Sequence, residues 1–143
     1  MKEDLNYMLA QAIKSIEYRF IKSTISSKEG FGEFKISPQT RTPVEIMNHM
    51  FDLARKTKTM VTEGHFNVPA VEISGFSEER ERLLNEIKVL TLVISESEID
   101  LDIAKKLLQG PVMDMATHTG QIAMLNGIHG NKIPGESFYD VEM

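Results

Sequence analysis

The chain has 143 residues, of which 41% are hydrophobic and 26% charged, a balance typical of one globular domain and unlike that of disordered chains. A net charge of −5 without long basic runs argues against a nucleic-acid surface or a polybasic membrane segment. With no cysteine, any metal ion would need nitrogen and oxygen ligands. No apolar run approaches the roughly 20 residues of a membrane span, and the first residues lack the apolar core of a signal peptide, so we expect a cytoplasmic protein.

Two helices are predicted in the first half of the chain. Residues 3–26 carry apolar side chains at three- and four-residue spacing, which places them on one helical face. The segment 28–40 contains glycine and proline and is expected to be a loop. The second helix has a clear start, because Thr42 and Glu45 flank a proline in the order of a capping box. Gly64 is its predicted end.

The second half predicts two further helices. The third should begin at Ser77 as N-cap, followed by acidic residues that suit the positive end of the helix dipole. The segment 98–106 is ambiguous between a separate turn and the approach to the last helix. That helix should cover 107–129, with its true beginning possible at Pro111, and Gly130 should follow its C-terminus.

Four amphipathic helices in one short chain predict an all-α fold, an antiparallel four-helix bundle, with residues 1–143 as a single domain. The first two connections, of about 15 and 12 residues, are longer than a minimal bundle needs, so we expect them to form a pocket rim. The adjacent aromatics Phe138 and Tyr139 suggest that the C-terminal tail docks on the helices.

His49 is the first candidate functional residue. It lies three residues after Ile46 and four before Leu53, so it should point with the apolar face toward the core. A core histidine needs polar partners, because an unpaired one costs about 1–3 kcal/mol. Taken alone, His49 is better explained as a buried neutral imidazole bonded to a backbone carbonyl or to a polar side chain than as a metal ligand.

A second group of candidates lies on the predicted last helix. At spacings of four and three residues, one stripe contains Leu107, Pro111, Asp114, His118, Gln121 and Leu125. Asp and His one turn apart can bind a single ion, and a His on a facing helix can complete the set. The sequence therefore predicts a metal site of His49, Asp114 and His118. The alternative is an Asp–His hydrogen bond without metal.

The remaining polar residues have simpler interpretations. Gln121 could orient a bound water or an imidazole next to the cofactor, or form a hydrogen bond between helices. Glu45 is explained by the capping box, His65 should be exposed in a loop, and His129 suits the last turn of a helix. No hydroxyl side chain has an obvious base partner, so no catalytic residue is assigned.

Two segments resemble the DinB-like (damage-inducible) superfamily, which includes the YfiT-like metal-dependent hydrolases. The segment 42–50 resembles the region that carries the first metal histidine of that family, and 110–125 resembles its last helix, where H-x-x-x-H is followed by GQ. The ending 130–134 is also similar. Here Asp114 stands where the family has the first His of the pair, and a carboxylate is an acceptable ligand for divalent metals.

The resemblance implies one divalent metal ion (Zn, Ni, Mn or Fe), a small-molecule substrate or thiol cofactor, and a homodimer. It leads us to expect a metal-dependent enzyme, either a hydrolase using metal-bound hydroxide or a thiol-dependent transferase. Two other possibilities stay open: a protein that binds a metal or a small molecule without turnover, and a helical bundle in which the three residues form only a polar network.

Overall fold

The computed structural model describes residues 2–143, with side chains from residue 3 onward. The chain is all-α, as predicted, and residues 2–143 contain no strand. Its elements are α1 (Lys2–Thr24), η1 (Phe31–Glu33), α2 (Pro43–Glu63), α3 (Phe76–Glu96), α4 (Leu101–Leu107), η2 (Leu108–Val112), α5 (Met113–Ile128) and η3 (Phe138–Asp140). None of the helices within this range has the length and apolar character needed to cross a bilayer.

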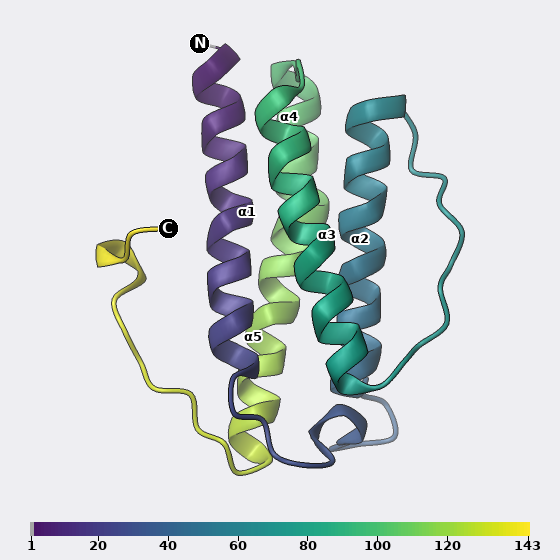
Figure 1. Cartoon of the computed structure of the whole chain (residues 1–143), viewed down its shortest axis with the longest axis vertical. Helices are drawn as coiled ribbons and strands as arrows, with labels where there is room; N and C mark the ends of the chain where they lie inside the picture. Colours follow the sequence, from purple (N-terminus) through teal and green to yellow (C-terminus); the bar gives the residue numbers. More distant parts are fainter. Residues whose placement is uncertain (1) are drawn as a thin grey trace.

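The long helices lie side by side along the long axis of the molecule (Figure 1). Both α1 and α2 pack against α3 and against α5. Their inner faces meet in one apolar core, which lowers the free energy of the folded chain by removing apolar surface from water. The largest fully buried side chains are Phe20, Phe31, Ile13, Met47, Met50, Leu83, Ile87, Leu90, Ile94, Leu107, Met115 and Ile122.

Helices α2 and α3 run in the same direction, so this neighbouring pair departs from the antiparallel arrangement expected from the sequence. Near their beginnings, Asn48 Nδ2 donates to Glu79 Oε1 at 3.3 Å, and farther along both helices Lys58 pairs with Glu86 at 2.5 Å. The connecting segment 64–75 must therefore return along the length of α2, which Figure 1 shows. Hydrogen bonds tie this segment to α2, including one of 2.9 Å from Arg55 Nη1 to the carbonyl of Pro69.

Most predicted helix ends are confirmed. The backbone N–H of Thr42 donates to Glu45 Oε1 at 3.0 Å, and that of Glu45 donates to Thr42 Oγ1 at 3.3 Å, which is the predicted capping box. Gly64 ends α2 with a φ of 80°, and Gly130 follows α5 with a φ of 99°; both values favour glycine. The predicted N-cap at Ser77 is wrong, because the N-cap is Gly75, two residues earlier, and α3 begins at Phe76.

The last helix contains one irregular turn that its sequence pattern does not predict. Residues 101–128 are continuously helical, but η2 is a π-helical turn in which the N–H of Met113 donates to the carbonyl of Leu108, five residues back. Pro111 lies within this turn and explains it, because proline has no N–H to donate and its ring would clash with the carbonyl four residues earlier. The segment 98–106, left ambiguous above, contributes α4 to the same helix.

The C-terminal tail docks on α1, as the paired aromatics predicted. Phe138 packs edge-on against Tyr18 with ring centroids 6.1 Å apart, and the Arg19 guanidinium lies 4.0 Å from the centroid of the Phe138 ring. Glu136 accepts hydrogen bonds from Lys22 Nζ at 2.6 Å and from the Tyr18 hydroxyl at 3.0 Å. These contacts hold the tail against one helix surface.

Candidate functional site

Two histidines from different helices meet on one side of the molecule. His49 comes from the second turn of α2 and His118 from the second turn of α5, and both side chains are half-buried. Their ring centroids are 4.9 Å apart and the rings are nearly perpendicular, at 82°. Residues almost 70 positions apart thus share one polar patch beside an otherwise apolar core.

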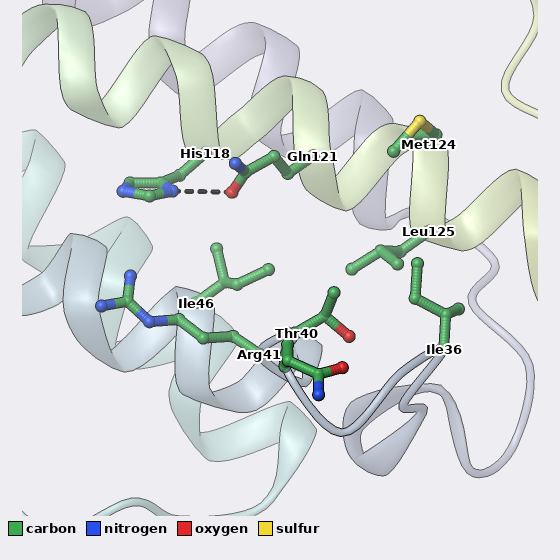
Figure 2. A pocket seen from close by; sticks show the side chains of 9 residues that line it. Ile36, Thr40, Arg41, Ile46, His118, Gln121, Met124 and Leu125 are labelled. Atoms are coloured by element: carbon green, nitrogen blue, oxygen red, sulfur yellow. Dashed lines mark hydrogen bonds between the residues drawn. The ribbon is translucent and has the colours of Figure 1, made fainter.

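Gln121 fixes the orientation of the His118 ring. A hydrogen bond of 2.8 Å joins His118 Nδ1 to Gln121 Oε1, one turn later on the same helix (Figure 2). Because an amide oxygen can only accept, Nδ1 carries the donated proton. In the neutral imidazole, Nε2 is then left with a free lone pair. Gln121 therefore orients an imidazole, one of the two roles considered for it, and the bond lies within a single helix.

His49 is neutral more readily than an ordinary histidine. Burial is the main cause that lowers its pKa below 6.5, followed by the positive charge of Arg41 and by His118. Asp52 and Asp114 act in the opposite direction but do not reverse the shift. Near neutral pH His49 therefore adds little positive charge here, and Arg41 is the permanent cation of this region.

The predicted metal cofactor is wrong. No group of three or more His, Asp or Glu side chains in residues 3–143 is arranged to hold a metal ion. Of the three expected ligands, Asp114 fits least: its side chain is exposed, and among the groups that affect the pKa of His49 it has the smallest effect. A divalent ion such as Zn needs at least three protein ligands, so His49 and His118 alone do not make the expected site.

The π-helical turn explains the missing ligand. One extra residue in η2 rotates everything after it by about 100° relative to a continuous α-helix. The inner face therefore passes through Leu107, Val112, Met115, Thr119 and Ile122 instead of the predicted stripe. As a consequence, the stripe that begins with Asp114 lies at the edge of the helix interface.

A pocket of about 300 Å³ lies next to His118. Its lining residues come from the segment before α2, from the first turn of α2 and from α5: Ile36, Gln39, Thr40, Arg41, Ile46, His118, Gln121, Met124 and Leu125. In Figure 2 the Arg41 guanidinium and the His118 ring lie toward one end, whereas Ile36, Met124 and Leu125 lie toward the other. The pocket is therefore amphipathic along its length.

The predicted rim is confirmed for the first of the two long connections, because the segment 36–41 lines the pocket. Local hydrogen bonds give this segment its shape. The N–H of Gln39 donates to Ser37 Oγ at 3.1 Å, and the N–H of Thr40 donates to the Ser37 carbonyl at 3.2 Å. Arg41 then stands directly between this turn and the capping box of α2.

Sequence reasoning did not identify Arg41 or Met124 as site residues. Arg41 directly precedes the Thr42 N-cap, so its place at the mouth of a pocket could have been inferred once the first connection was expected to form a rim. Of the other histidines, His65 is exposed, as predicted. His129 is half-buried and packs against Phe34, with ring centroids 4.8 Å apart.

Comparisons with models of protein families, with curated proteins and with solved structures found no match for this chain.

Proposed function

We propose that this protein binds a small, largely apolar molecule in the pocket between the segment 36–41 and α5. The pocket itself carries the proposal, because it combines a buried apolar floor, formed by Ile46 and Leu125, with a few polar groups. That combination is typical of small-molecule sites, and a volume of about 300 Å³ fits a small ligand.

The His118–Gln121 pair supports a recognition role for the polar side of this pocket. A hydrogen bond of 2.8 Å to Gln121 holds the His118 ring in one orientation, so this side of the pocket is ordered before a ligand binds. Of the functions considered from the sequence, binding without turnover is the one retained. A metal-dependent reaction has no three-residue ligand set to support it in residues 3–143.

The relation to the DinB-like superfamily and the four-helix-bundle arrangement form part of the same proposal. Contacts within the chain support the bundle: α1 pairs in opposite direction with α3, because Thr24 contacts Arg80 and Asn6 contacts Ile94. The resemblance of the segments 42–50 and 110–125 to motifs of the DinB-like superfamily supports membership in that family.

We also propose that the protein forms a homodimer through the outer face of α5. Met113, Met124 and Ile128 are 51–60% exposed there, and the exposed Gly120 lies one turn before Met124 on that face, where it would let another helix approach closely. Apolar exposure of this kind on one helix is typical of an interaction surface. Sedimentation velocity tests it: an Ile128→Lys variant, which leaves the pocket lining unchanged, should sediment as a monomer at a concentration where the wild type is dimeric. A wild type that is monomeric throughout would contradict the dimer.

The experiment that tests the binding function blocks the pocket from its rim. Ile36 is 44% exposed, so Ile36→Trp should fill the pocket without disturbing the core. Ile73→Trp is the matched control, because Ile73 is 51% exposed in the segment 64–75, away from the pocket lining.

A library of small apolar fragments is screened by ligand-observed NMR against all three proteins. We expect fragments that bind the wild type and Ile73→Trp and do not bind Ile36→Trp. The proposal fails if no fragment binds the wild type, or if Ile36→Trp retains all of the fragments that do.

A further inference from the structure

Resting on the proposed function, the pocket also indicates the chemical class of its ligand. We propose that the ligand is a small monocarboxylate, whose carboxylate pairs with the Arg41 guanidinium while its apolar tail lies along Ile46 toward Ile36 and Leu125. The proposal comes from the juxtaposition of one free cation and one apolar end in a single pocket.

The first step concerns the charge of Arg41. Within residues 3–143 its guanidinium forms no hydrogen bond and no ion pair, although it lines the pocket. The acidic residue nearest to Arg41 in the sequence is Glu45, whose carboxylate is hydrogen-bonded to Thr42 in the capping box. These hydrogen bonds are the main cause of the lowered pKa of Glu45, and the charge of Arg41 has the smallest effect on it. The guanidinium is therefore available to an external anion, and its fork of donors matches a carboxylate.

The second step concerns position. The backbone on both sides of Arg41 is held, by the turn at Ser37–Thr40 before it and by the capping box after it. A side chain on a fixed backbone loses less conformational freedom when it binds than one on a mobile loop. Figure 2 shows this side chain extended along the pocket toward the His118 ring.

The third step concerns the number of charges and the tail. Arg41 is the one Lys or Arg side chain among the lining residues of the described chain, which favours a singly charged carboxylate over a phosphate carrying nearly two charges. The opposite end offers the apolar side chains of Ile36, Met124 and Leu125, with the uncharged Gln39 and Thr40 beside them. An unbranched tail therefore gains affinity there with each buried methylene, up to about fourfold per group.

The test uses the full chain and four six-carbon probes: hexanoate, 1-hexanol, hexylamine and hexyl phosphate, titrated by two-dimensional NMR. So few atoms should give dissociation constants in the millimolar range. We expect hexanoate to bind about tenfold more tightly than hexanol, hexyl phosphate to bind no more tightly than hexanoate, and hexylamine to bind most weakly. Butyrate should bind more weakly than hexanoate.

Variants separate this inference from the proposed function. Arg41→Gln should lower hexanoate affinity about tenfold and leave hexanol unchanged, whereas Lys106→Gln, which removes the same charge from exposed α4, should change neither. Arg41 is exposed, so the variant should fold. If hexanol binds as tightly as hexanoate, or Arg41→Gln leaves hexanoate binding intact, the carboxylate assignment is overturned and the pocket stands. If none of the probes binds, the proposed function itself falls.

Discussion

The register of the last helix can be tested by two neighbouring substitutions. Met115 is fully buried because the π-helical turn rotates it into the core, and the same rotation leaves Asp114 exposed. Replacing a fully buried methionine by alanine removes core contacts and leaves a cavity, so Met115→Ala should lower the free energy of unfolding by about 2–5 kcal/mol. Asp114→Ala should change it by no more than about 0.5 kcal/mol.

For a chain of this length, about 1 kcal/mol corresponds to a shift of roughly 3–4 °C in Tm, so Met115→Ala should melt at least about 6 °C below the wild type. Urea unfolding followed by circular dichroism gives both free energies, and unchanged m-values would show that only stability has altered. A continuous α-helix would place Asp114 inward. A large loss for Asp114→Ala together with a loss below about 1 kcal/mol for Met115→Ala would therefore refute the shifted register.

Three further predictions concern titration and buried charge. The pKa of Tyr18 is raised above 10.0, mainly by its hydrogen bond to Glu136, so Glu136→Ala should return it toward the ordinary value in a ¹³C-tyrosine NMR titration; an unchanged pKa would mean that the tail is not docked. The pKa of His49 is lowered, chiefly by burial, so the folded state binds its proton less readily than the unfolded chain. The contribution of His49 to stability is therefore present above about pH 6.5 and is lost as the pH falls toward the lower pKa of the folded state. In urea unfolding at several pH values, His49→Gln should make the free energy of unfolding less dependent on pH in this range; a variant whose curve runs parallel to that of the wild type would contradict this prediction. Glu79 is fully buried and paired with Arg82, so Glu79→Ala should lower the free energy of unfolding by about 3 kcal/mol in urea; a loss below about 1 kcal/mol would contradict the role of that pair.

Local signals in the sequence were sufficient for several parts of the fold. The capping box at Thr42 and the glycines after α2 and α5 act through a few neighbouring residues, so their effect is readable without knowledge of the rest of the chain. The start of α3 was less readable. Ser77 is a favourable N-cap residue, but the carboxylate of Glu79 accepts from the N–H of Ser74 at 2.8 Å and from Arg82, which ties the preceding segment to this helix end.

The site was harder to predict because it depends on helix register. The stripe through Asp114 and His118 assumed 3.6 residues per turn across Pro111, and one π-helical turn was enough to rotate it. The Gly110-Pro111 pair was the available signal, and it was interpreted as a possible helix start instead of an interior irregularity. The direction of the segment 64–75 also follows from contacts between distant residues, which no local pattern records.

The most direct test of the ligand pocket is to observe which protein groups touch a bound molecule. Isotope-filtered NOE spectra of labelled protein with unlabelled hexanoate report those contacts. We predict NOEs from the hexanoate tail to the methyl groups of Ile36, Ile46 and Leu125, which line the pocket. NOEs confined to Ile21 and Leu92, which line a separate hollow between α1 and α3, would contradict the assignment.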